Sequence, residues 1–148
     1  MMLDETDKKI LRLLQENARI SNAEIARQVE LAPSAVLKRI RTLETEEVIL
    51  GYETRLNPAK LDLGMTSLVE IDTAEKPGSL GVGKKIATLP EVQEISFFAG
   101  ESFYLAKVRT KNPETHSELI QKMGDLGATH TRTVLLLKNI KDSLKLDF

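Results

Sequence analysis

The chain has 148 residues, of which 41% are hydrophobic and 29% are charged, so its composition suits a globular protein of one or two small domains. No stretch approaches the roughly 20 apolar residues that span a bilayer, the N-terminus is acidic, and cysteine is absent. We therefore expect a cytoplasmic protein without signal peptide, membrane span, disulfide or thiolate site, and the net charge of -1 requires any nucleic-acid-binding surface to be local.

Three short helices are predicted at the start of the chain. The first covers residues 4–17, with Asp4 as its N-cap and an apolar stripe at helical spacing. The second follows Ser21, which is a good cap, and the third begins at Pro33, whose missing N–H is not needed in a first turn. The three-residue turn between the second and third helices, at residues 30–32, indicates a helix-turn-helix.

The third helix has two distinct faces. Val36, Ile40 and Leu43 recur at helical spacing and form the inner stripe, whereas Ser34, Lys38, Arg41 and Thr45 fall on the opposite side. This outer face carries two cations and no carboxylate, so it can enter a major groove. The alternative is a solvated charged face in a small bundle. We expect Arg39 to pair with an acid of the first helix, such as Asp7. The residues expected to contact DNA are Ser21, Asn22, Pro33, Ser34, Ala35, Leu37, Lys38 and Arg41.

The second half of the chain changes its period. After a short β-like run at 48–52, Asn57-Pro58 marks a linker over 53–64. The elements predicted beyond it are a strand at 65–72, a helix ending at Pro90, strands at 92–99 and 103–109 around a turn at 100–102, a helix opened by Asn112-Pro113, and a strand at 131–138. The order β-α-β-β-α-β is the ferredoxin-like arrangement. We therefore predict an α+β protein with a helix-turn-helix domain at 1–52 and a ferredoxin-like domain for dimerisation and effector sensing at 65–148.

The last strand predicts an interface. Residues 131–138 carry apolar side chains on both faces, and an exposed apolar sheet face calls for a partner, for which a symmetric second copy is the commonest solution. The alternative is a strand buried within the monomer.

The sequence contains no complete catalytic or metal-binding pattern. Residues 78–85 nearly match a phosphate-binding loop, but Lys85 replaces the hydroxyl that would hold magnesium, so we interpret these glycines as the start of a helix. His116, predicted on a helix surface, and His130, before a strand, lack metal-ligand spacing, and no serine, histidine and acid group suggests a nucleophilic site. We predict neither an enzyme nor a bound cofactor or metal.

At this point the chain resembles the Lrp/AsnC (leucine-responsive regulatory protein, feast/famine) family of transcription regulators. The likeness is carried by Leu3-Asp4-x-x-Asp7-x-x-Ile10-Leu11, Asn17-Ala18-Arg19-Ile20-Ser21, Glu24-Ile25-Ala26-x-x-Val29-x-Leu31, Val36-x-x-Arg39-Ile40-x-x-Leu43-Glu44 and Val48-Ile49-x-Gly51-Tyr52, and later by Leu89-Pro90-Glu91-Val92, Gly100, Tyr104-Leu105-x-x-Val108 and Thr131-x-Thr133. It covers nearly the whole chain, and the order and spacing of these pieces together make it specific.

The resemblance implies a homodimer made through the sheet, which commonly assembles further, often into an octamer. It implies that residues 48–55 pair with their counterpart in the partner subunit and that a small effector, usually an amino acid, binds between dimers. The effector residues so implied are Gly100, Glu101, Ser102, Phe103, Thr131 and Thr133. Phe103 stands where many members have an aspartate, so the site takes either a different ligand or none. Glu30 and Glu47 stand where the pattern favours glycine, which a non-glycine can replace at some cost.

These observations predict a sequence-specific regulator that binds double-stranded DNA and responds to an amino acid or another small metabolite. The alternative is a metabolite-sensing assembly module that acts mainly through co-assembly with partner regulators.

Overall fold

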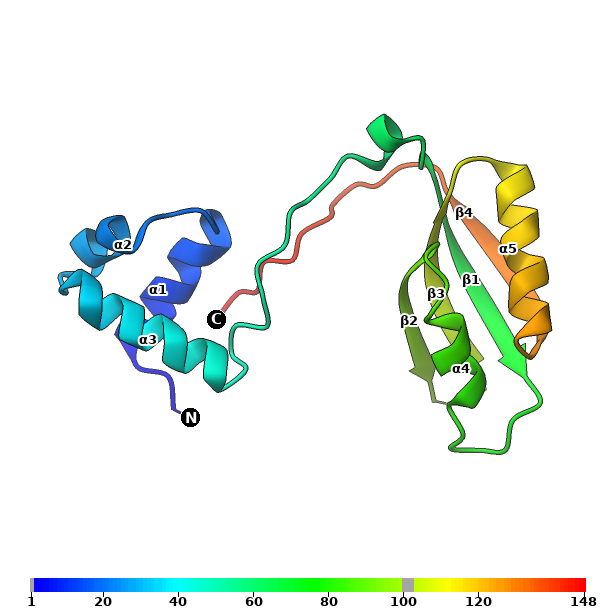
Figure 1. Cartoon of the computed structure of the whole chain (residues 1–148), viewed down its shortest axis with the longest axis horizontal. Helices are drawn as coiled ribbons and strands as arrows, with labels where there is room; N and C mark the ends of the chain where they lie inside the picture. Colours follow the sequence, from blue (N-terminus) through cyan, green and yellow to red (C-terminus); the bar gives the residue numbers. More distant parts are fainter. Residues whose placement is uncertain (1, 100–102) are drawn as a thin grey trace. The chain divides into compact units, whose positions relative to one another are not determined.

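The computed structural model describes residues 2–99 and 103–148, and the chain divides into two compact units (Figure 1). The N-terminal unit comprises the residues up to Arg55 together with Ser143–Phe148, and the C-terminal unit comprises Leu56–Asp142. The sequence assigns the whole of 65–148 to one domain, whereas the last six residues group with the helices at the start of the chain. Within the described residues, no helix is both long and apolar enough to cross a membrane.

The N-terminal unit is built from α1 (Glu5–Glu16), α2 (Asn22–Val29) and α3 (Pro33–Thr45), as predicted. Asp4 and Asp7 form a capping box at the start of α1, and the Ser21 side chain accepts from the Glu24 N–H at 3.1 Å at the start of α2. These caps satisfy backbone donors that a helix N-terminus leaves unpaired. The buried core of the unit contains Ile10, Leu11, Ile25, Ala26, Val36, Ile40 and Leu43.

The turns that bound α3 use non-glycine residues in the left-handed region. Glu30, which ends α2, has φ 58°, and Glu47, just after α3, has φ 55°. Both positions are those where the family pattern favours glycine, and a residue with a Cβ adopts this region at a cost of roughly 1 kcal/mol. The helix-turn-helix therefore forms despite two locally unfavourable residues.

The β-like run at 48–52 forms neither helix nor strand in the single chain, and its pairing with a second copy stays a prediction. A strand requires a neighbour with which to exchange backbone hydrogen bonds, and Leu50 is instead 90% exposed. Ile49 packs against the core of the N-terminal unit, whereas Val48, Leu50 and Tyr52 are exposed.

The C-terminal unit is a four-stranded antiparallel sheet in the order β2-β3-β1-β4. Its elements are η1 (Pro58–Leu61), β1 (Met65–Thr73), α4 (Gly81–Ile86), β2 (Val92–Phe98), β3 (Phe103–Thr110), α5 (Pro113–Asp125) and β4 (Ala128–Leu136). The order and topology are those of the predicted ferredoxin-like fold. The last strand begins earlier than predicted, because Ala128 already pairs with Thr73 across a shift in register.

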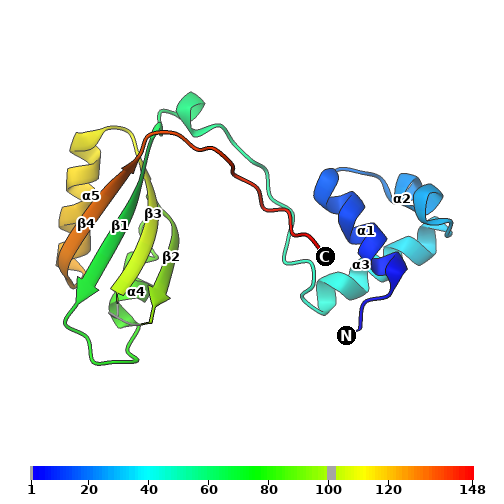
Figure 2. The ribbon, with the colours of Figure 1, turned by 180° about the vertical axis from the view of Figure 1, so that it is seen from behind.

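The helices α4 and α5 lie on the same side of the sheet (Figures 1 and 2). Val69 and Ile71 of β1 are fully buried on that side, together with Val108 of β3 and Leu119 and Met123 of α5. Because side chains alternate along a strand, their neighbours point to the other side.

The sheet face away from the helices is partly apolar. Leu68 of β1 pairs with Val134 of β4 on this face, and Val134 is 57% exposed. β4 is an edge strand of the sheet, so the interpretation of this strand as buried within the monomer is wrong. One chain therefore leaves this face open to solvent.

One of the glycines at 78–85, Gly83, is required by packing. A Cβ on Gly83 would lie 2.3 Å from the Tyr104 ring, so only glycine lets α4 approach β3 this closely. The Tyr104 hydroxyl donates to Glu75 at 2.9 Å, and Glu75 also accepts from the Val82 N–H at 2.8 Å. The preceding loop is thereby fixed to the sheet, and the glycines lie at the start of α4, as interpreted from the sequence.

Candidate nucleic-acid interface

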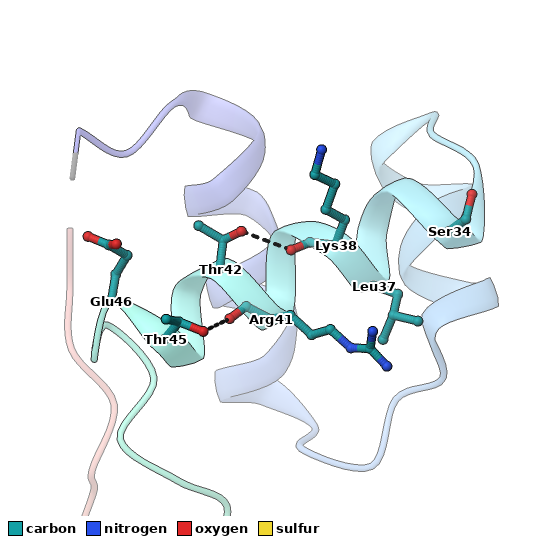
Figure 3. A pocket seen from close by; sticks show the side chains of 7 residues that line it. All are labelled: Ser34, Leu37, Lys38, Arg41, Thr42, Thr45 and Glu46. Carbon is teal, nitrogen blue, oxygen red and sulfur yellow. Dashed lines mark hydrogen bonds between the residues drawn. The ribbon is translucent and has the colours of Figure 1, made fainter.

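The outer face of α3 is a shallow hollow lined by Ser34, Leu37, Lys38, Arg41, Thr42, Thr45 and Glu46 (Figure 3). The Thr42 hydroxyl donates to the Lys38 carbonyl at 3.0 Å, and the Thr45 hydroxyl donates to the Arg41 carbonyl at 2.8 Å. These two hydroxyl protons are therefore used within the helix. The Ser34 hydroxyl, at the helix start, has no hydrogen-bond partner among the described residues.

Lys38 and Arg41 supply the positive charge of this face. Both side chains are exposed, and in the part of the chain that the structure describes neither forms a salt bridge. Lys38 therefore lies at the surface of the N-terminal unit. A guanidinium and an ammonium group side by side on a helix suit phosphate oxygens and guanine edges.

Arg39 is not part of this face. Its Nη1 donates to Asp7 at 2.7 Å and to Asp4 at 2.8 Å, which confirms the expected pairing with α1. The bonds to Asp7 and then Asp4 raise the pKa of Arg39 further above its ordinary value. The pKa of Asp4 is lowered, first by the Asp7 N–H and then by Arg39. Arg39 therefore clamps α3 to the start of α1.

The other residues predicted to contact DNA take different positions. Ala35 is half-buried and lines a second hollow with Lys38, while Asn22 is half-buried at the first position of α2. Ser21 uses its side-chain oxygen as the α2 cap, and Pro33 is exposed at the start of α3. The structure thus groups Ser34, Leu37, Lys38 and Arg41 on one face and leaves the remaining four around it.

Thr42 and Glu46 line this hollow although sequence reasoning did not assign them to the outer face, and Glu46 changes its charge. Glu46 follows α3 directly and brings a carboxylate to the end of the cationic face. Helical spacing from Thr42 places Glu46 on the same side, so the signal was present in the sequence. A carboxylate repels phosphate, which limits how far along α3 a DNA backbone can lie.

The residues expected to bind an effector are separated within one chain. Gly100, Glu101 and Ser102 lie outside the described residues. Phe103 is next to the buried Tyr104 and therefore points away from the helices, where it stacks on Phe98 with ring centres 5.5 Å apart. Thr131 pairs with Ile71 and points to the helix side. Phe103 and Thr131 consequently lie on opposite faces of the sheet.

His116 is buried, so its predicted place on a helix surface is wrong. Its Nε2 lies 3.0 Å from the Thr133 hydroxyl, and its Nδ1 has no hydrogen-bond partner among the described residues. Burial lowers the pKa of His116, which favours the neutral ring. The described residues contain no group of three or more histidine, cysteine or acidic side chains able to hold a metal ion.

Two family models match the chain. The AsnC-type helix-turn-helix domain matches residues 3–44, and the Lrp/AsnC ligand binding domain matches residues 66–146. Among curated proteins, the leucine-responsive regulatory protein of Escherichia coli strain K12 is 34% identical over 150 residues, which cover 97% of this chain and 90% of the relative. The protein of the same name from Haemophilus influenzae is 34% identical and covers 95% of this chain and 87% of its own length.

Solved structures agree with these matches. A transcriptional regulator of Neisseria meningitidis in complex with L-methionine superposes with a TM-score of 0.89 at 28% identity, covering 99% of this chain and 97% of its own. The feast or famine regulatory protein of M. tuberculosis complexed with L-methionine gives a TM-score of 0.91 at 26% identity, covering 98% and 99%.

Proposed function

Because the chain belongs to the Lrp/AsnC family of transcription regulators, we propose that it binds double-stranded operator DNA through the outer face of α3 and that an amino acid or a similar small metabolite modulates this binding. The observation that carries the proposal is the exposure of Lys38 and Arg41, unpaired within the described residues, on the third helix of a helix-turn-helix. We assign the chain no catalytic role, because its relatives are transcription regulators.

The contacts follow from the positions of the side chains along α3. Ser34 lies in the first turn, which enters the major groove first in this motif and can meet a phosphate or a base edge. Lys38 acts as a point charge toward phosphate, whereas the planar guanidinium of Arg41 can donate two parallel hydrogen bonds to guanine. Leu37, at the edge of the hollow, is placed for contact with a thymine methyl group.

We further propose that two copies pair through the open faces of their sheets. Leu68 and the exposed Val134 give this face an apolar centre that one chain leaves uncovered. A twofold pair would present two α3 helices to a pseudo-palindromic operator. The segment 48–55 forms no strand in one chain, and we propose that it pairs with its counterpart in the second copy. We also propose that these dimers assemble further, up to an octamer.

The proposal that an amino acid or a similar metabolite binds this chain rests on its relatives. The second family model is a ligand-binding domain, and two similar structures are complexes with L-methionine. Because Phe103 and Thr131 lie on opposite sheet faces of one chain, a site that uses both requires more than one copy. Calorimetric titration of the full chain with each amino acid tests this proposal. Heat above buffer dilution for at least one of them is expected, and its absence for all would contradict it.

Selection from randomised double-stranded DNA tests the main proposal. The full chain should enrich a pseudo-palindromic site, and Arg41→Ala should relax the base preference at one position of each half-site. Lys85→Ala, which removes an exposed cation of α4, is the matched control and should select the same site. Ligand-dependent assembly, measured by mass, without enrichment of any site would instead favour the co-assembly module.

A further inference from the structure

The exposed side of α1 carries an extended segment of the chain, Ser143–Phe148. The side-chain Nε2 of Gln15 donates to the backbone carbonyl of Leu146 at 3.0 Å, and the Leu146 N–H donates to the side-chain Oε1 of Gln15 at 2.7 Å. One side chain thus satisfies both backbone groups of one residue, as a neighbouring strand would. Such a reciprocal pair fixes the register of an extended peptide.

Two flanking contacts fix the direction of the segment. The Lys145 ammonium lies 2.7 Å from a Glu16 carboxylate oxygen. On the other side of Leu146, Arg12 donates to the Phe148 carbonyl oxygen at 2.5 Å, and its guanidinium carbon lies 5.5 Å from the centre of the Phe148 ring. A cation on an aromatic face and an ion pair both depend on the identity of the tail side chains. The segment is therefore recognised by its sequence as well as by its backbone.

We propose that the outer side of α1, formed by Arg12, Gln15 and Glu16, is a docking surface for Ser143–Phe148 of the same chain. The chain leaves the N-terminal unit after Arg55 and rejoins it at Ser143. Docking therefore attaches residues 56–142 to the helices at both ends, and this second tether restricts the rotation of the helix-turn-helix. Each of the contacts described is made to α1 and none to α3, so a docked segment leaves the cationic face open.

The segment is held by polar contacts more than by burial. Leu144 remains 77% exposed and Leu146 74% exposed, so little apolar surface is removed from water. The attachment is accordingly weak for a free peptide and depends on covalent connection to supply a high effective concentration. This argues for the same chain as the occupant and makes the tether reversible.

Hydrogen exchange of the full-length protein tests the docking, and the readout is the Leu146 amide. A hydrogen bond of ordinary net strength protects it about fivefold relative to an unstructured peptide. Gln15→Ala should abolish this protection, since alanine maintains the helix but removes both partners. Gln28→Ala, the same change on exposed α2, is the control and should leave it intact. Equal exchange of Leu146 in wild type and Gln15→Ala would overturn the proposal.

A charge exchange gives a second, independent variant. Glu16→Lys should release the segment by repulsion from Lys145, and adding Lys145→Glu should restore the protection of Leu146. Failure of the double variant to recover any protection, with Glu16→Lys itself deprotected, would show that Glu16 acts on α1 and not on the segment, contrary to the proposal.

Cross-linking identifies the occupant. The chain has no cysteine, so Ala18→Cys with Asp147→Cys introduces a unique pair beside the contacts at exposed positions. A flexible bis-maleimide should then give a cross-linked monomer on a denaturing gel. A cross-linked dimer as the main product would show that the segment docks on another copy and would overturn the assignment to the same chain. None of these readouts involves DNA or an effector, so the docking can fail while the proposed function stands, and the reverse.

Discussion

Replacing Lys38 by alanine isolates the electrostatic part of DNA binding. Its ammonium group is exposed on α3 and makes no salt bridge within the described residues, so its removal leaves no buried charge and breaks no clamp. Arg39, one position along, is by contrast bound to Asp7 and Asp4. Lys38→Ala should therefore weaken DNA binding while leaving the free energy of unfolding within about 0.5 kcal/mol of wild type.

The magnitude follows from counterion release. Each phosphate neutralised contributes about 0.9 to the slope of log affinity against log salt concentration on B-form DNA. A pair of copies loses two such contacts, so the slope should become shallower by about 1.8. Between about 50 and 200 mM salt, the wild type should consequently lose roughly twelvefold more affinity than the variant.

The assay is a fluorescence-anisotropy titration on one operator and one unrelated duplex at four salt concentrations. Lys38→Ala should lower affinity for both duplexes by a similar factor, since phosphate contacts carry no sequence information. Lys85→Ala serves as control and should retain the wild-type slope. A slope unchanged by Lys38→Ala, at unchanged stability, would refute the assignment of Lys38 to phosphate.

Three further predictions concern the fold. Gly83→Ala should destabilise the C-terminal unit by about 1–3 kcal/mol in urea unfolding, because its Cβ would lie 2.3 Å from the Tyr104 ring; an unchanged midpoint would show that the ring moves freely. Glu47→Gly should stabilise the chain by about 0.5–1 kcal/mol in the same assay, as φ 55° costs a residue with a Cβ, and a loss of stability would contradict the strain. Burial lowers the pKa of His116, so the unfolded chain binds more protons below pH 6.5, and stability should fall as pH drops through that value. Comparing urea midpoints at pH 7.5 and 5.5 checks this, and His116→Gln, which still reaches Thr133, should show a smaller fall.

The elements of the fold were predictable where local signals agreed. Asp4, Ser21 and Pro33 mark the starts of α1, α2 and α3, and apolar spacing assigns the inner faces. The ferredoxin-like order followed from alternation and turn residues alone. The positive φ at Glu30 and Glu47 required a family pattern, because nothing local to a glutamate indicates a left-handed turn.

The departures of the single chain from these predictions have separate physical causes. Residues 48–52 have strand composition but no partner in one chain, and β propensity expresses packing against neighbours more than an intrinsic preference. His116 lies three residues before Leu119 and seven before Met123, so helical spacing places it on the buried face of α5. The prediction was wrong because a polar residue was expected on the helix surface. The docking of Ser143–Phe148 depends on contacts with residues over 120 positions away, which no periodicity reports.

The charge on α3 has a consequence for how the regulator would act in a cell. With Lys38 and Arg41 as the exposed cations of the α3 face and an overall charge of -1, one copy gains little from nonspecific attraction to DNA. Occupancy of a promoter would then depend on valency, because several modest contacts multiply when copies are linked. Promoter output should accordingly rise steeply with the abundance of the regulator, and a change in assembly would act as strongly as a change in affinity.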